Sequence, residues 1–147
     1  GFHALEVVQC MAERRDLGGR PQGVDAVTYL EGDAVWQAAE RGVWSWELLS
    51  HALGRSNTVN PGDVRQNTRD FKRPGVRDRE TIFDFPVAFV VEYVDGLRGT
   101  VLILNGHVDD TTVAVRTTDA AGRIDYKAPA DSAYIRSPLT DPTPNRL

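Results

Sequence analysis

The sequence has very little cysteine: Cys10 is its single thiol, so the chain cannot form an internal disulfide. Small secreted domains usually rely on several disulfides for stability. The sequence also shows no basic segment followed by a short apolar run, which is the pattern of a secretory leader. We therefore expect a cytoplasmic, reducing environment.

Long apolar runs and an excess of positive charge are also missing. The longest strongly apolar stretch, residues 86–94, is interrupted by Glu92 and is much shorter than the roughly 20 residues that span a bilayer. Lysine and arginine total 17 against 21 aspartates and glutamates, a net charge of −4, whereas nucleic-acid binding relies on clustered cationic side chains. We expect neither a membrane nor a nucleic acid as partner.

The common zinc motifs are absent as well. The three histidines and Cys10 form neither a Cys-x-x-Cys nor a His-x-x-x-His pair, and structural zinc sites take four ligands with characteristic spacings. We expect no metal site, and we predict that Cys10 is a small buried thiol.

What the sequence does contain is enough apolar material for one domain. It has 147 residues and 41% hydrophobic content, which suffice to bury a core. The apolar spacing predicts a helix over residues 2–15, with His3, Glu6 and Cys10 on one side and the apolar stripe that packs on the other.

A strand and two short helices are predicted next. The β-branched and aromatic content of residues 24–30 favours a strand. Asp33 is placed to cap a helix over residues 34–41, and Ser45 to cap another over residues 46–53.

Four further strands are predicted in the second half of the chain. Residues 87–94 and 97–104 flank Asp95-Gly96, which is typical of a β-hairpin. Residues 111–117 repeat the strand composition, and residues 123–127 are predicted to return as a shorter strand after a glycine turn.

Two segments lack periodicity. Residues 55–81 are predicted to be a functional loop, an interface arm or a disordered insertion. Residues 128–147 contain four prolines and are predicted to be an extended tail after a domain formed by residues 1–127. The order of elements predicts an α+β fold with a predominantly antiparallel open sheet and helices packed on one face.

Three local features resemble the C-terminal domain of the Gfo/Idh/MocA oxidoreductases, the family of glucose-fructose oxidoreductase and inositol dehydrogenase. Gly1-Phe2-His3-Ala4-Leu5-Glu6 resembles the family's Gly-x-His-x-x-Asp segment, with Glu6 in place of the usual Asp. The predicted strand over residues 24–30 is placed like the strand after that helix. Residues 89–100 resemble the family's hairpin.

The resemblance implies the substrate-binding and oligomerisation part of an NAD(P)-dependent oxidoreductase that acts on a sugar or cyclitol. The family's N-terminal Rossmann domain, with its glycine-rich phosphate turn, would precede Gly1. Gly18 and Gly19 follow a predicted helix rather than a strand, so they do not form such a turn. We therefore expect a piece of a longer protein, inactive alone, with its main NAD(P) site elsewhere and a homo-oligomer interface on the sheet.

His3 and Glu6 are the candidate catalytic residues. A histidine has an unperturbed pKa of about 6.5, so either of its forms is available near neutral pH, and Glu6 is placed one turn later to orient the ring. The alternatives are a solvated histidine and an ordinary first-turn acid that the helix dipole favours.

Asn105 and His107 are the candidate substrate-binding residues. They lie in a glycine turn after a predicted strand, with two aspartates just beyond. This group could hydrogen-bond the hydroxyls of a polyol, although the chemistry of turns explains the same residues equally well. Trp36, Trp44 and Trp46 could stack against a sugar, but core packing is the favoured interpretation.

Two other classes of function stay open. One is a non-catalytic interaction or dimerisation module with a sheet-mediated interface, because apolar residues such as Phe89 and Val90 alternate onto both faces of a strand. The other is a small ligand-binding protein that is complete in itself.

Overall fold

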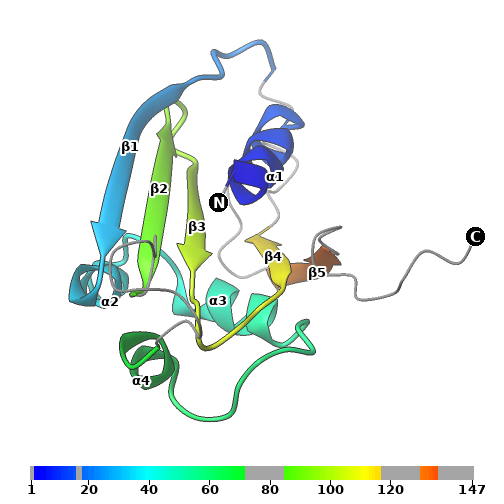
Figure 1. The fold of residues 1–147 in the computed structure, drawn as a ribbon. Helices are drawn as coiled ribbons and strands as arrows, with labels where there is room; N and C mark the ends of the chain where they lie inside the picture. Colours follow the sequence, from blue (N-terminus) through cyan, green and yellow to red (C-terminus); the bar gives the residue numbers. More distant parts are fainter. Residues whose placement is uncertain (1, 16–17, 72–84, 117–129, 136–147) are drawn as a thin grey trace, which may run out of the picture.

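The computed structural model describes residues 2–15, 18–71, 85–116 and 130–135, the last as backbone only. In chain order the elements are α1 (Phe2–Glu13), β1 (Val24–Glu31), α2 (Asp33–Glu40), α3 (Trp46–Leu53), α4 (Val64–Arg69), β2 (Val87–Tyr93), β3 (Arg98–Ile103), β4 (Thr111–Arg116) and β5 (Ala130–Ile135). Figure 1 shows β1, β2 and β3 as one sheet, with α1 beside one end and α2, α3 and α4 at the other.

The three-stranded sheet is antiparallel, in the order β1-β2-β3. Val91 of β2 lies opposite Val27 of β1 on one side and Gly99 of β3 on the other. Strands β4 and β5 form a separate antiparallel pair that contacts α3. The predicted α+β class with a predominantly antiparallel open sheet is confirmed.

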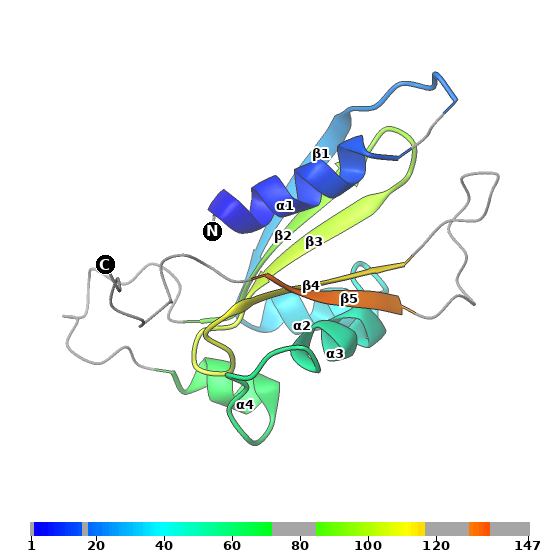
Figure 2. The same ribbon diagram turned by 90° about the vertical axis from the view of Figure 1, so that its right-hand side faces the viewer.

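The helices lie on both faces of the three-stranded sheet rather than on one face. Val91 and Tyr93 of β2 pack with Ala12 of α1, whereas Ala88, on the opposite face of the same strand, packs with α2 and α3. In Figure 2 the strands lie between α1 and the α2–α3 pair. The reason is the composition of β2, which has apolar side chains on both of its faces, so that each face must be covered.

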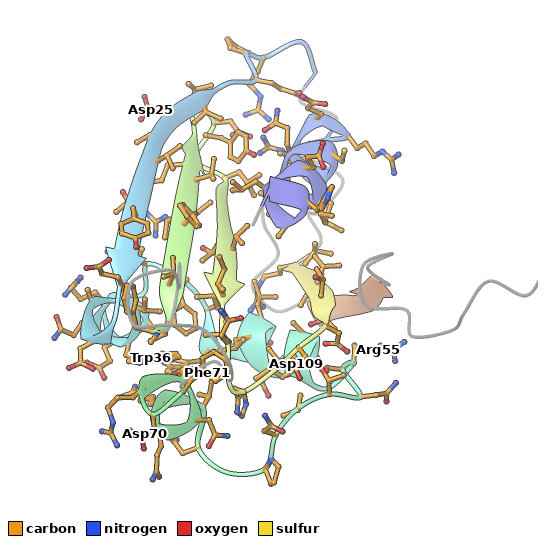
Figure 3. All side chains as sticks on the ribbon, viewed as in Figure 1. Asp25, Trp36, Arg55, Asp70, Phe71 and Asp109 are labelled. Atoms are coloured by element: carbon orange, nitrogen blue, oxygen red, sulfur yellow. The ribbon has the colours of Figure 1, made fainter. Side chains whose placement is uncertain are left out.

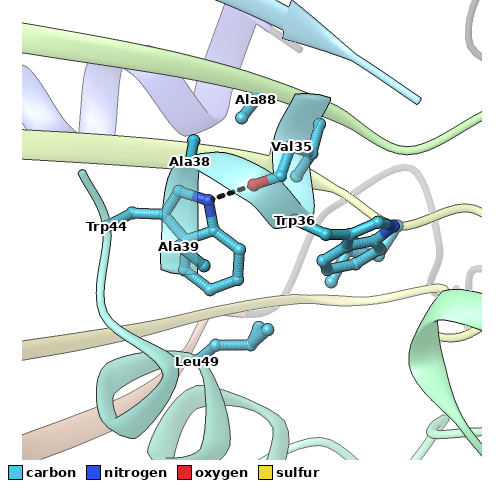
Figure 4. Close-up of a cluster of buried hydrophobic side chains, with 8 residues drawn as sticks. Val35, Trp36, Ala38, Ala39, Trp44, Leu49 and Ala88 are labelled. Carbon is cyan, nitrogen blue, oxygen red and sulfur yellow. Dashed lines mark hydrogen bonds between the residues drawn. The ribbon is translucent and has the colours of Figure 1, made fainter. Parts of the chain in front are cut away.

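The larger core lies between the sheet and the α2–α3 pair. Its buried members, several of which are drawn in Figure 4, are Val35, Trp36, Ala38, Ala39, Trp44, Leu49, Ala88 and Leu104. The Trp44 indole donates a hydrogen bond of 2.8 Å to the Val35 carbonyl, so its one polar atom is satisfied inside the core. The core interpretation therefore holds for Trp36 and Trp44.

The helix caps agree with the sequence in one case and differ in another. The Ser45 hydroxyl accepts a hydrogen bond from the Leu48 amide, as predicted for α3. Helix α2 instead begins at Asp33 itself, with Gly32 at its N-cap and no side-chain cap. Gly32 has a φ of 57°, which only glycine adopts readily. The chain turns at this residue, and α2 begins one residue earlier than predicted.

Two segments predicted to lack regular structure contain elements. Helix α4 lies inside residues 55–81, where the Asp63 carboxylate caps it by accepting from the Gln66 amide. Strand β5 lies inside the predicted tail, residues 128–147, and pairs with β4. Short elements of this kind have too few residues to show a period. The predicted return strand over residues 123–127 lies outside the described residues.

Candidate functional site

The predicted pair on α1 is formed, and it is open to solvent. His3 Nδ1 lies 3.0 Å from Glu6 Oε2, and the two side chains are 79% and 52% exposed. Cys10 is also exposed, so the prediction of a buried thiol is wrong. The side of α1 predicted to face a site therefore faces water among the described residues.

The opposite side of α1 is seated on the sheet by close packing. Leu5 and Ala12 contact the cluster around Val91 and Tyr93. A Cβ atom on Gly99 of β3 would lie 2.5 Å from Cγ1 of Val8, so only glycine allows the helix to approach this closely. The predicted apolar stripe packs on the sheet except at Met11, which is exposed, and His3 and Glu6 lie on the outer side of the helix.

A polar cluster that the sequence did not predict holds the end of α1 to the hairpin. Arg15 forms a largely buried ion pair with Asp95 of the β2–β3 turn, and its guanidinium lies 5.2 Å from the centre of the Tyr93 ring. Burial raises the pKa of the Tyr93 hydroxyl, and the Arg15 charge opposes that shift. The hydroxyl donates to Gln9 Oε1 at 3.1 Å.

His107 is buried, with 5% of its surface exposed. Its Nδ1 lies 3.0 Å from Nδ2 of Asn67 on α4. Its backbone carbonyl accepts a hydrogen bond of 2.8 Å from the backbone amide of Asn60. The preceding Gly106 packs so tightly that an added Cβ would lie 2.7 Å from Cβ of Phe71. The His107 ring is thus enclosed within the protein, with the Asn67 side chain as its hydrogen-bonding neighbour.

The two predicted pairs of site residues lie in different parts of the molecule. Asn105, which is half-buried, and His107 follow β3 next to α4. Helix α1, which carries His3 and Glu6, lies at the other end of the sheet (Figure 1). The described structure therefore does not assemble these four side chains into one site.

The three tryptophans form one aromatic cluster under an arginine. The rings of Trp36 and Trp46 stack with 5.6 Å between centroids, and Trp44 packs 4.9 Å from Trp46. The Arg65 guanidinium of α4 lies 5.8 Å from the centre of Trp36 and 5.3 Å from that of Trp46. Trp46 is the one exposed member. Figure 3 shows Trp36 and Phe71 near α4, far from Asp25 at the other end of the sheet.

Strand β1 presents an uncovered apolar strip, which is formed by Val24, Val27 and Tyr29. Their exposed fractions are 48%, 60% and 47%. An irregularity in the pairing between Val24 and Ala26 places Val24 opposite Tyr93. This extra residue restores Val24 to the face that Val27 and Tyr29 share. The sequence signal for the strip was the β-branched and aromatic content of residues 24–30.

Two hollows are present near the hairpin. The larger, about 400 Å³, is lined by Asp25, Glu92, Tyr93, Val94, Gly96, Leu97 and Arg98. The smaller, about 110 Å³, is lined by residues at the end of α1 and by Gln22, Gly23 and Tyr93. Neither hollow contains a predicted site residue.

The described residues do not form the phosphate site of a dinucleotide. Gly18 and Gly19 have positive φ angles, but they follow α1 and precede β1, whereas the phosphate turn of that site joins a strand to a helix. Within the same residues there is no group of three or more His, Cys, Asp and Glu that could hold a metal ion. None of the described helices has both the length and the apolar character needed to cross a membrane.

No protein-family model, curated protein or solved structure matches this chain. These comparisons therefore do not test the local resemblance to the Gfo/Idh/MocA oxidoreductases.

Proposed function

We propose that this chain is an interaction module that associates through the β1 side of its sheet, and that its partner there is a second copy of the chain. The observation that supports this most directly is the strip of Val24, Val27 and Tyr29, three large side chains exposed side by side on an edge strand. Exposed apolar patches of this kind are typical of protein interfaces, and an unpaired strand edge adds main-chain donors and acceptors.

The distribution of charge on β1 fits an interface. Its two acidic residues, Asp25 and Glu31, lie near the two ends of the strand, and the residues between them are uncharged. Interfaces commonly have such a low-charge centre with a polar rim. A self-complementary contact also needs one patch only, because a two-fold axis brings the same residues together from both copies.

The test is the mass of the particle in solution. We expect light scattering during gel filtration to give a dimer at micromolar concentration for the unmodified chain. Val27→Lys buries a charge in the contact and should weaken dimerisation by about tenfold or more. Thr28→Lys is the matched control, because Thr28 is exposed on the other face of the same strand. A monomer at every concentration, or equal weakening by both variants, would contradict the proposal.

A second candidate function is favoured by the His3–Glu6 contact. We propose that the chain supplies this pair to the substrate site of an NAD(P)-dependent oxidoreductase that acts on a sugar or cyclitol. In that site the imidazole would accept the proton of a substrate hydroxyl, and the Glu6 carboxylate would orient the ring. The described residues leave the pair exposed and do not fit the dinucleotide, so another domain would have to complete the site.

This second candidate is tested on the longer protein that it requires. A polypeptide with a Rossmann domain ahead of Gly1 should quench or shift NADH fluorescence on binding and should oxidise a sugar or cyclitol. His3→Ala should abolish turnover and leave NADH binding intact. His51→Ala, which changes an exposed histidine on α3, is the control. Turnover that survives His3→Ala would exclude the catalytic role.

A further inference from the structure

We propose that His107, Asn67 and Pro61 form a latch that holds α4 against the β3–β4 connection while the His107 ring is neutral, and that acid loosens α4 from the tryptophan cluster. This inference concerns the α4 end of the molecule and is independent of the β1 interface. We call the three residues the α4 latch.

The latch fixes the protonation state of His107 through its hydrogen bonds. Asn67 Nδ2 lies 3.1 Å from the Pro61 carbonyl oxygen and 3.0 Å from His107 Nδ1. A carbonyl oxygen only accepts, so this end of the Asn67 side chain is the amino group, which donates to both. The ring nitrogen Nδ1 must therefore accept, and the ring is neutral with its proton on Nε2.

Protonation of the ring cannot be accommodated by turning the Asn67 amide. A charged imidazole carries a proton on each nitrogen, so Nδ1–H would face the Asn67 amino group. Rotating the amide by a half turn would offer its oxygen to the ring but would set that oxygen against the Pro61 carbonyl. One hydrogen bond of the α4 latch is lost in either arrangement.

The surroundings of the latch favour the neutral ring on balance, because the effect of burial outweighs that of the nearby carboxylate. Burial lowers the pKa of His107, and the Asp63 carboxylate at the start of α4 partly opposes this shift. The two arginines of α4 have carboxylate partners, Glu40 for Arg65 and Asp70 for Arg69. On the other side of the ring, Asp109 and Asp110 follow along the chain, and their backbone amides donate to the Thr58 hydroxyl.

The direction of the pH effect follows from this lowered pKa. When α4 is released, His107 regains an ordinary pKa of about 6.5, so the open form takes up a proton at a higher pH than the closed form. The closed form is therefore most favoured above about pH 6.5 and loses stability as the pH falls from there to the lowered pKa. Below that value the balance no longer changes through His107.

The latch connects to the aromatic cluster through Arg65. This residue lies two positions before Asn67 on α4, and its guanidinium covers Trp36 and Trp46. Loosening of α4 therefore withdraws a cation from two indole rings. Tryptophan fluorescence reports the movement directly.

The experiment is native-state hydrogen exchange of the α4 amides at pH 7.5 and pH 5, corrected for intrinsic rates, with tryptophan fluorescence in parallel. We expect the opening constant of α4 to rise about threefold to tenfold in acid, the factor given by the loss of one hydrogen bond, while the β2 amides stay protected. Unchanged α4 protection, or equal loss in β2, would overturn the latch.

Two variants separate the latch from other titrating groups. His107→Asn keeps an acceptor near the position of Nδ1 and removes the titration, so its α4 opening should be independent of pH. Asn67→Asp places a carboxylate beside the ring, so its α4 should close in acid instead of opening. A full pH response in His107→Asn would assign the effect to other groups and overturn the proposal.

A direct measurement covers the case in which either variant fails to fold. The ¹⁵N chemical shifts of the His107 ring in the unmodified protein should show the neutral Nε2–H form at pH 7.5. A ring protonated on Nδ1 at that pH would contradict the latch geometry.

Discussion

Similar side chains are buried in one region of the molecule, the α4 end, and exposed in another, the β1 side of the sheet. At the α4 end, Trp36 and Trp44 are buried between α2, α3 and the sheet, and the His107 hydrogen bonds fasten the cover. On the β1 side, Val24, Val27 and Tyr29 lie exposed on the sheet. Residue type is therefore not what separates a core from a surface here. The difference is the position of the helices, because α1 packs on β2 and β3, at the side of the sheet away from β1 (Figure 1).

This difference suggests that the α4 end stabilises the folded monomer, whereas the β1 strip contributes on association. At the α4 end most of the apolar groups are packed, and the side chains of Trp44 and His107 have hydrogen-bond partners within the protein, so this end stabilises the folded chain. The β1 strip contributes less to the stability of the folded monomer, because about half of the surface of its side chains stays in water. Its apolar surface contributes free energy only when another surface covers it.

The largest expected effect contrasts two valines in adjacent strands. Val90→Ala should lower the free energy of unfolding by about 2–3 kcal/mol, because Val90 is 1% exposed and its truncation leaves a cavity. Val27→Ala should change it by less than about 0.5 kcal/mol in the monomer. Urea unfolding of both variants at a concentration below dimerisation measures the two values. Equal losses would mean that β1 is part of the core.

A smaller effect contrasts two glycines with nearly the same backbone. Gly96 and Gly106 have φ angles of 87° and 89°, so alanine strains both. A Cβ on Gly96 would meet nothing within 4 Å, whereas one on Gly106 would lie 2.8 Å from the backbone carbonyl oxygen of Asn67. Gly106→Ala should therefore cost about 1–2 kcal/mol more than Gly96→Ala. Thermal melts would reveal the difference. Identical melting temperatures would show that α4 moves away from an added Cβ at position 106 without cost.

The smallest expected effect is at the exposed pair on α1. Glu6→Gln removes the charge that faces His3, and the pair is largely solvated, so stability should change by no more than about 0.5 kcal/mol. Chemical denaturation at pH 6 and pH 8 gives the measurement, with Glu13→Gln on the same helix as control. A loss above about 1 kcal/mol would show that the pair stabilises the fold and would weaken the case for a role in a site.

Much of the fold could be predicted from local sequence. The Asp95-Gly96 turn between two β-rich runs predicted the β2–β3 hairpin, and Ser45 predicted the start of α3. The i and i+3 spacing of His3 and Glu6 predicted their contact. Each of these rests on residues close together in the chain, whose geometry the backbone fixes.

The candidate sites depended on long-range packing and could not be predicted in the same way. His107 suggested a polar turn, but its side chain is buried and its ring contacts Asn67, which lies 40 residues earlier in the chain. The role of Arg65 over the tryptophans was hidden for the same reason, since α4 is only six residues long and shows no period. Arg15 and Asp95 lie 80 positions apart in the chain.

By itself, the sequence determined the α+β class, the antiparallel hairpin, the starts of α1 and α3 and the His3–Glu6 contact, because periodicity, turn chemistry and caps act over a few residues. The tertiary structure alone decided that helices cover both faces of the sheet, that His107 is enclosed and that the β1 strip stays open. Those outcomes depend on which apolar surfaces meet across the molecule, and burial is a property of the assembled layers rather than of any short segment.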